Sequence, residues 1–188
     1  MASSLVSRVW KPVAAAFVSA ALLAGCGAGD GAGSSADESA DEGDVNVVQI
    51  SDGVEVSVSE DTGSRPVVTV PDAEPPTTLF TADVVEGSGA EAKAGDAVAV
   101  QYAGFNWSNG KEFDASWNRG AQPFEVSPLG SAPVIQGWND GLIGAQVGDR
   151  RVIVIPPELG YGAQGAGGVI GPNETLVFVV DVVSINGQ

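Results

Sequence analysis

The carboxyl-terminal part of the chain contains the pattern that most constrains the fold. Between positions 176 and 182, large apolar side chains recur at every second residue, with Asp181 on the opposite face; they are Leu176, Phe178, Val180 and Val182. Side chains with this period share one face of a β-strand. The chain also has 26 glycines and 11 prolines, which are too many for a helix bundle. We therefore expect a fold built mainly from strands and turns.

Three further patterns predict other strands. Val98, Val100 and Tyr102 fall on one face of a strand, with Ala99 and Gln101 on the other. The dipeptide Asn109-Gly110 predicts a type I′ hairpin turn, because both residues accept a positive φ. Residues 151–155 form an apolar, β-branched run that two prolines close. These segments predict a largely antiparallel sheet.

One segment has the spacing of a helix. Trp138, Leu142 and Ala145 recur at i, i+4 and i+7, which predicts a short amphipathic helix from Gln136 to Ala145. Gly148 follows as a plausible stop. One helix with four to six strands, mostly antiparallel, makes the predicted fold class α+β.

The amino terminus has the features of an export signal. Arg8 and Lys11 lead into an apolar stretch, Val13 to Ala24, which suits a signal peptide and is too short to cross a bilayer as a helix. The stretch ends in Leu23-Ala24-Gly25-Cys26, which resembles the bacterial lipobox, in which the cysteine is acylated and becomes the new amino terminus. The alternatives are an ordinary signal peptide with a chance cysteine, or a buried amino-terminal helix. We favour a lipoprotein, because the single cysteine stands where lipidation requires it.

These features divide the chain into four parts. Residues 1–25 are the expected signal peptide, and residues 26–44 a lipidated linker of small and acidic residues that bury almost nothing. Residues 45–76 alternate apolar and polar positions and predict two short strands, split by residues 61–64. This β extension is too small for its own core, so it packs on the following domain, which we favour, or stays mobile. Residues 77–188 form the main domain.

The composition excludes several functions. The formal net charge of −16 argues against nucleic acid as a partner, because phosphate backbones are held by Lys and Arg. The chain has no histidine, which excludes His-dependent acid/base chemistry and His-based metal sites. The single cysteine cannot form an internal disulfide. We expect neither a metal nor a cofactor.

The order of motifs from Val84 to Ile185 resembles the FKBP-type peptidyl-prolyl isomerase family. Each motif is weak alone, but the set is collinear and has family-like spacing: Val100-Gln101-Tyr102-Ala103-Gly104, Gly110-Lys111-Glu112-Phe113-Asp114-Ala115-Ser116, Val134-Ile135-Gln136-Gly137-Trp138, Gly141-Leu142, Val147-Gly148-Asp149-Arg150, Pro156-Pro157, Gly160-Tyr161-Gly162 and Thr175-Leu176-Val177-Phe178. The resemblance implies an antiparallel half-barrel sheet wrapped on one short helix, with a shallow apolar cleft between them.

The resemblance also assigns the cleft residues. Trp138 would form the floor, Asp114 and Tyr161 the polar rim, and the Ile135 backbone N–H would hold a substrate carbonyl. The walls would be Tyr102, Phe113, Phe124, Val134, Ile135, Ile170 and Phe178. Within this set, Phe124, Val134 and Ile170 would bind substrate and the other residues would serve catalysis. The implied partners are X-Pro polypeptides and possible macrolide inhibitors, with the membrane reached through lipid on Cys26.

Other interpretations of these residues and of the chain remain open. Without the resemblance, Tyr102, Phe178 and Trp138 are ordinary core residues, and Asp114 caps a turn or pairs with Arg119. The domain could be an FKBP-like binding module or chaperone with little catalysis, or a structural lipoprotein with no cleft. Residues 166–168, Ala-Gly-Gly, stand where many family members have a bulkier loop, so substrate preference and macrolide affinity stay open. The expected function is an isomerase that assists exported proteins, lipid-anchored on the extracytoplasmic side of a bacterial membrane.

Overall fold

The computed structural model describes residues 44–51 and 54–188. The predicted signal peptide, Cys26 and all but the last residue of the predicted linker lie outside the described residues. Among the residues that are described, no helix has the length and apolar character needed to cross a membrane.

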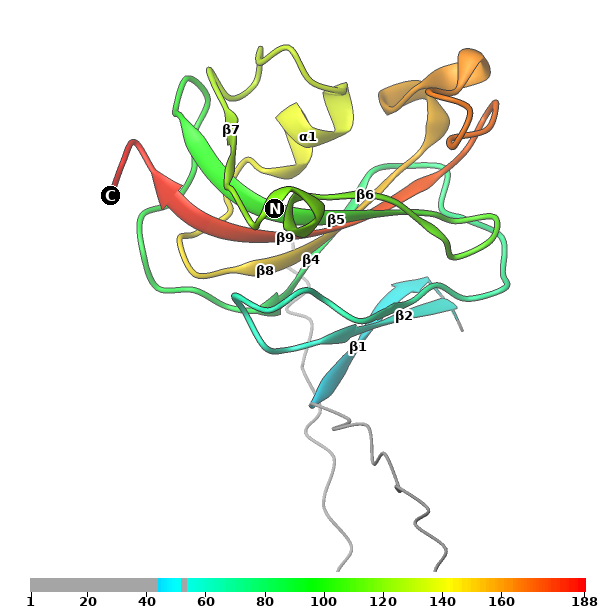
Figure 1. The fold of residues 1–188 in the computed structure, drawn as a ribbon, viewed down its shortest axis with the longest axis horizontal. Helices are drawn as coiled ribbons and strands as arrows, with labels where there is room; N and C mark the ends of the chain where they lie inside the picture. The colour runs from blue at the N-terminus through cyan, green and yellow to red at the C-terminus, as the bar shows by residue number, and fades with distance from the viewer. Residues whose placement is uncertain (1–43, 52–53) are drawn as a thin grey trace, which may run out of the picture. The chain divides into compact units, whose positions relative to one another are not determined.

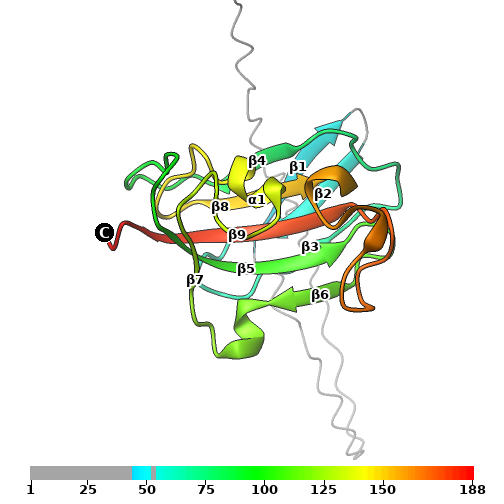
Figure 2. The same cartoon turned by 90° about the horizontal axis from the view of Figure 1, so that it is seen from above.

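A six-stranded antiparallel sheet forms the centre of the main domain (Figures 1 and 2). Its strands follow the order β4-β8-β9-β5-β6, and β7 pairs with β5 beside this path. The two long central strands, β5 and β9, contain the two alternating patterns seen in the sequence. The predicted α+β fold class is confirmed. The strands are β4 (Phe80–Val85), β5 (Val98–Asn106), β6 (Glu112–Ala115), β7 (Phe124–Val126), β8 (Arg150–Ile155) and β9 (Leu176–Ile185).

The helix α1 (Gln136–Gly141) lies over one face of this sheet (Figure 1). The prediction of a helix to Ala145 was wrong, because α1 ends at Gly141. Gly144 adopts a positive φ of 80°, and its N–H donates to Ala92 O at 2.9 Å instead of continuing the helix. Leu142 and Ala145 are both fully buried in the core, although they lie beyond the end of the helix. Their spacing therefore reflects burial and not helical structure. Three short 3-10 helices complete the domain: η1 (Ser116–Arg119), η2 (Pro157–Leu159) and η3 (Gly162–Gln164).

The hairpin between β5 and β6 forms where Asn109-Gly110 predicted it, but its turn is not type I′. Only Gly110 has a positive φ, of 64°, while a type I′ turn needs it at both residues. The loop is longer than two residues, since Asn106 N–H donates to Lys111 O at 2.9 Å. The Asn109 side chain accepts from the Lys111 N–H at 2.8 Å, the local bond that asparagine commonly makes in turns.

Residues 45–76 form a three-stranded sheet on the opposite face of the main sheet from α1 (Figure 1). The strands are β1 (Val45–Ser51), β2 (Val54–Ser59) and β3 (Val68–Thr69), one strand more than predicted. Val56 and Val58 are fully buried in a core that they share with the outer face of the main sheet. The main-sheet members of this core include Ala103, Phe105, Val152, Val154, Val177 and Val179. The extension therefore packs on the domain.

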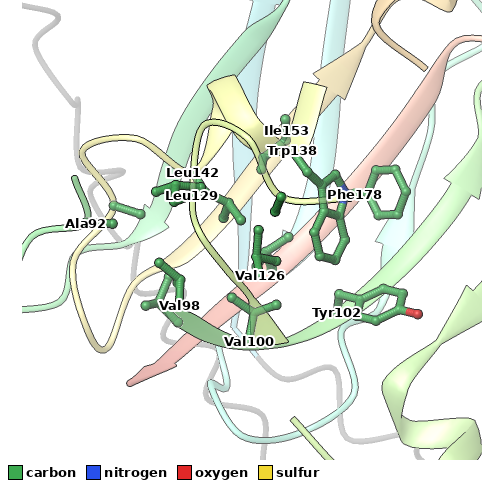
Figure 3. Packing of buried hydrophobic residues seen from close by; sticks show 14 of the residues in the cluster. Ala92, Val98, Val100, Tyr102, Val126, Leu129, Trp138, Leu142, Ile153 and Phe178 are labelled. Atoms are coloured by element: carbon green, nitrogen blue, oxygen red, sulfur yellow. The ribbon is translucent and has the colours of Figure 1, made fainter. Parts of the chain in front are cut away.

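The second core lies between the main sheet and α1 (Figure 3). Inward-facing residues of β5, such as Val98 and Val100, meet Leu142 and Ile153 there. At one end of this core the aliphatic side chains give way to aromatic ones, and Tyr102, Trp138 and Phe178 gather (Figure 3). The fold thus places an aromatic cluster at the open end of the sheet–helix layer.

Candidate active site

A hollow of about 180 Å³ opens above this aromatic cluster. It lies on the α1 side of the main sheet, and its lining comes from β5, β7, β9, α1 and the segments before α1 and η3. The lining residues are Tyr102, Phe124, Pro133, Val134, Ile135, Trp138, Tyr161 and Phe178. Seven of these eight side chains were named from the sequence as cleft residues.

The strand register explains how the wall aromatics meet. Gly104 lies directly opposite Phe178 in the β5–β9 ladder, on the same face as Tyr102. A Cβ at Gly104 would stand 2.6 Å from the Phe113 ring and 2.7 Å from the Phe178 ring, closer than any real contact. The glycine therefore leaves room for Phe113 and Phe178 to pack edge to face, with ring centroids 5.5 Å apart.

Trp138 lines the hollow and forms its floor. Figure 3 shows its ring beside that of Phe178. Trp138 lies in the first turn of α1 and is only 4% exposed. Its ring packs edge to face on the rings of Tyr102, Phe124 and Phe178, at centroid distances of 5.1, 5.8 and 5.2 Å. Its indole N–H is buried and has no acceptor within the described part of the chain. The three ring contacts therefore fix the orientation of the indole that forms the floor.

A three-residue polar network borders the aromatic wall. The Tyr102 hydroxyl donates to Asp114 Oδ2 at 2.5 Å, and Arg119 donates to Asp114 Oδ1 at 2.6 Å and to the Tyr102 hydroxyl at 2.5 Å. The Arg119 guanidinium also lies 5.7 Å from the centre of the Tyr102 ring, within range of a cation–π contact. The alternative pairing of Asp114 with Arg119 is therefore present, and it coexists with the bond from Asp114 to a cleft tyrosine.

This network shifts two pKa values in opposite directions. Burial, together with the hydrogen bond and the negative charge of Asp114, raises the pKa of Tyr102 to about 12, against the opposing effect of Arg119. Burial by itself would raise the pKa of Asp114, but hydrogen bonds from Arg119 and Tyr102 outweigh it and lower that pKa below its usual value. At neutral pH the hydroxyl is consequently protonated and the carboxylate ionised.

Two donors at the mouth of the hollow are free to meet a ligand. The Tyr161 side chain is 41% exposed, and its hydroxyl makes no hydrogen bond within residues 44–51 and 54–188. The Ile135 N–H, just before the first turn of α1, likewise donates to no acceptor in the described part of the chain. Both groups border the same hollow, so they can bind carbonyl groups of one extended peptide.

The remaining predicted residues lie beside the hollow instead of lining it. Phe113 packs against Phe178, which lines the hollow. Asp114 accepts a hydrogen bond from the hydroxyl of Tyr102, which also lines it. Ile170 is 7% exposed and belongs to the same core as Trp138. Ile170 lies in the segment 165–171, which we call the flap and which rises on the α1 side of the sheet (orange in Figure 1).

Two residues of the site were not assigned to it from the sequence. Pro133 lines the hollow, and Arg119 completes the polar network. Pro133 directly precedes the Val134-Ile135 motif, which is the signal that could have found it. Arg119 was considered only as a partner of Asp114, because its contact with Tyr102 depends on the 3-10 turn of η1. Among the described residues, no three Asp, Glu, His or Cys side chains come together as a metal site requires.

Comparison with known proteins gives one consistent result. The sequence profile of a family described as FKBP-type peptidyl-prolyl cis-trans isomerase matches residues 89–183. An FK506-binding protein of Streptomyces anulatus is 49% identical over 122 residues, which cover 64% of this chain and 97% of the relative. A probable FK506-binding protein of Corynebacterium glutamicum is 39% identical over 120 residues, which cover 64% of this chain and 98% of the relative.

Solved structures agree with the sequence matches. The crystal structure of FkpA from Escherichia coli superposes with a TM-score of 0.51 at 40% identity, covering 60% of this chain and 50% of that one. The crystal structure of AtFKBP13 gives a TM-score of 0.52 at 36% identity, covering 58% of this chain and 94% of that one.

Proposed function

The chain belongs to the FKBP-type peptidyl-prolyl cis-trans isomerase family, and we propose that it rotates X-Pro bonds of exported proteins at the outer face of a bacterial cell membrane. As a family member the protein is a peptidyl-prolyl isomerase. The observation that supports this choice of reaction most directly is the hollow over Trp138, which is walled by aromatic rings and has two unused hydrogen-bond donors at its mouth.

The reaction needs no nucleophile and breaks no covalent bond. Resonance holds an amide planar with a barrier of about 18–20 kcal/mol, and an X-Pro bond consequently isomerises over tens to hundreds of seconds. The state to be stabilised is a twisted amide, which has lost resonance and carries less separated charge. An apolar hollow favours this state over the planar, water-bonded one. The rings of Trp138, Tyr102 and Phe178 supply that environment.

Hydrogen bonds on either side of the proline would hold the peptide while its bond rotates. The Ile135 N–H and the Tyr161 hydroxyl are placed to bind substrate carbonyls, because both border the hollow. Asp114 would act without transferring a proton. Its carboxylate fixes the Tyr102 hydroxyl and, with Arg119, holds that ring against Trp138. Positioned groups of this kind lower the barrier by limiting the geometries that the bound substrate can adopt.

A protease-coupled assay on an X-Pro peptide tests the activity. We expect the wild-type protein to accelerate isomerisation and Phe113→Ala to lower the rate, because Phe113 supports the wall ring of Phe178. Phe80→Ala is the matched control, since Phe80 packs in the other core, against the extension. A rate no higher than the uncatalysed one for the folded wild-type protein would favour a binding module instead.

The membrane location is a separate part of the proposal and rests on Leu23-Ala24-Gly25-Cys26. Several acyl chains on Cys26 would anchor the protein firmly, because each buried methylene contributes about 0.8 kcal/mol. We expect the full-length chain, expressed in a bacterial host, to incorporate labelled palmitate and to fractionate with membranes. Cys26→Ser should abolish both properties. A Cys26→Ser protein that still sediments with membranes would contradict lipid anchoring.

The names of two relatives describe them as an FK506-binding protein and a probable FK506-binding protein. We propose that a macrolide of this type occupies the hollow over Trp138. The flap bears Ala166, Gly167 and Gly168, so it offers few side-chain contacts to a large ligand. We therefore expect binding to depend mainly on the aromatic walls.

A further inference from the structure

Asn106 is a buried polar residue on the cleft side of the main sheet. Along β5, Tyr102, Gly104 and Asn106 share one face, and across the ladder Asn106 lies opposite Leu176. Its side chain is only 4% exposed. An amide in such a place is costly to bury unless it makes hydrogen bonds, so its partners indicate what it does.

The Asn106 amide holds the flap. Its Nδ2 donates to Val169 O at 2.9 Å, a bond that spans 63 positions of sequence. Its Oδ1 is buried and has no partner among the described residues, so within them the bond to Val169 O is the only hydrogen bond that the side chain makes. The residue after Val169 is Ile170, which is buried in the core beside Trp138. Fixing the Val169 carbonyl therefore fixes the backbone from which Ile170 enters the core.

The two residues after Asn106 hold the segment that follows the flap. The Ser108 N–H and hydroxyl donate to the two carboxylate oxygens of Glu174 at 2.9 and 2.7 Å. The Trp107 N–H donates to Thr175 O at 2.9 Å. Residues 106–108, which we call the clamp, thus grip both the flap and its connection to β9.

The clamp is itself anchored on the extension. The Trp107 side chain is 5% exposed, and its indole N–H donates to Ala73 O at 2.7 Å. The clamp therefore rests on two independent supports, the β5 strand and residue 73 of the extension.

The flap needs such external contacts because its own sequence favours freedom. Gly165, Gly167 and Gly168 all have positive φ angles, of 61°, 57° and 72°. Glycine loses more backbone entropy on ordering than any other residue. Within the flap, Ala166 and Ile170 pair, since their N–H groups each donate to the other's carbonyl at 3.0 Å, and the Val169 N–H donates to Ala166 O at 3.2 Å.

We propose that Asn106 is a positioning residue for catalysis, which holds the flap in the conformation that substrate binds. The inference rests on the proposed isomerase cleft, but it assigns a role to a residue outside the hollow's lining. Releasing the Val169 carbonyl lets the flap sample other conformations, and a substrate must then reorder it on binding. The KM for an X-Pro peptide rises, whereas kcat changes little, because the bound complex restores the same geometry.

The test compares two asparagines with the same kind of bond. In Asn106→Ala we expect KM to rise about 2- to 10-fold, the effect of losing one hydrogen bond, with kcat within about twofold of wild type. Asn46→Ala is the control, because Asn46 Nδ2 also donates to a distant backbone carbonyl, Val84 O, at 3.1 Å, but lies in the extension. This variant should keep the wild-type KM.

Ser108→Ala is a milder second variant, since Ser108 is exposed and the change removes only the hydroxyl's bond to Glu174, while the backbone N–H keeps the other bond. We expect a smaller rise in KM in the same direction. Amide hydrogen exchange reports on the order of the flap directly: exchange of the Ala166 and Ile170 N–H groups should accelerate in Asn106→Ala and not in Asn46→Ala, and the split between KM and kcat then separates a positioning role from a purely structural one.

The outcomes separate this inference from the isomerase proposal. A folded wild-type protein without activity would overturn the isomerase assignment and the positioning role together. An active wild-type protein, with equal KM values or equal flap exchange rates in Asn106→Ala and Asn46→Ala, would overturn the positioning role alone.

Discussion

Arg150 and Asp181 lie opposite each other on β8 and β9 and form a fully hydrogen-bonded ion pair beneath the extension. Arg150 Nε and Nη2 donate to the two carboxylate oxygens of Asp181 at 2.6 and 2.7 Å, and the Arg150 side chain is completely buried. The same guanidinium donates to Ser59 O at 2.8 Å and Ser64 O at 2.7 Å. One side chain of the main sheet thereby ties down the chain that follows β2.

Arg150→Met should destabilise the protein severely. The change leaves the buried Asp181 carboxylate without its counter-charge and frees two backbone carbonyls, so we expect the free energy of unfolding to fall by about 3–5 kcal/mol. Arg65→Met is the control, because Arg65 also pairs with a carboxylate, that of Glu112, but its side chain is 49% exposed. That variant should lose less than about 1 kcal/mol. Similar losses in urea unfolding of the two variants would contradict this account.

The extension is expected to be part of the folded unit that carries the active site. Residues 44–188 fall within a single compact unit, and the extension covers apolar side chains on the outer face of the main sheet. A fragment of residues 45–188 should unfold at the temperature of the longer protein. A fragment of residues 77–188 should unfold at a lower temperature and bind a hydrophobic dye, because it exposes an apolar sheet face. Equal unfolding temperatures for the two fragments would show that the extension only rests on the surface.

The sequence predicted the main domain well because its signals are local. The alternation at Tyr102 and Phe178 follows from the pleat of β5 and β9, and the motif order identified the aromatic residues of the cleft. What it missed depends on long-range contacts. The end of α1 is set by a bond from Gly144 to Ala92, 52 positions away, and no local pattern predicts that bond.

Hydrogen bonds between side chains and distant parts of the backbone were likewise not predicted from the sequence. The Asn106 amide could not be linked to Val169 from the sequence, since that bond joins the end of β5 to the flap. The sequence did not predict β1, because its apolar residues are not confined to one face of the strand. Val45 and Val47 are exposed while Val48 is buried, so its apolar residues do not mark a single buried face.

Tyr161→Phe should lower activity without unfolding the protein. The Tyr161 hydroxyl has no hydrogen-bond partner in the described part of the chain, so its removal leaves no group unsatisfied in the free protein. If the hydroxyl binds a substrate carbonyl, kcat/KM should fall about 2- to 10-fold, the effect of one hydrogen bond. Circular dichroism and the unfolding temperature should stay at their wild-type values. Unchanged turnover would remove Tyr161 from the catalytic residues.

FK506 should alter tryptophan fluorescence through Trp138. The chain has four tryptophans, so the response must be assigned by substitution. Trp138→Phe should abolish the change in emission on adding FK506, whereas Trp117→Phe, which removes a tryptophan outside the hollow's lining, should retain it. A response that survives Trp138→Phe would place the macrolide elsewhere on the protein.

The raised pKa of Tyr102 predicts a loss of stability in alkali. The folded-state pKa of about 12 lies above the usual value of 10, so the folded protein holds this proton more tightly than the unfolded chain does. The resulting stabilisation is complete below pH 10 and is lost as the pH rises from about 10 to 12. The chain has two tyrosines, and Tyr161→Phe leaves Tyr102 as the only one.

In that single-tyrosine protein, phenolate absorbance should have its midpoint near pH 12 while circular dichroism still shows the folded state. In urea the midpoint should return to about 10. Asp114→Asn should move the folded midpoint down, because it removes the negative charge that opposes ionisation of the hydroxyl. A folded midpoint near 10 would mean that the Tyr102 hydroxyl is open to water, and the network that holds this ring against Trp138 would then not form in solution.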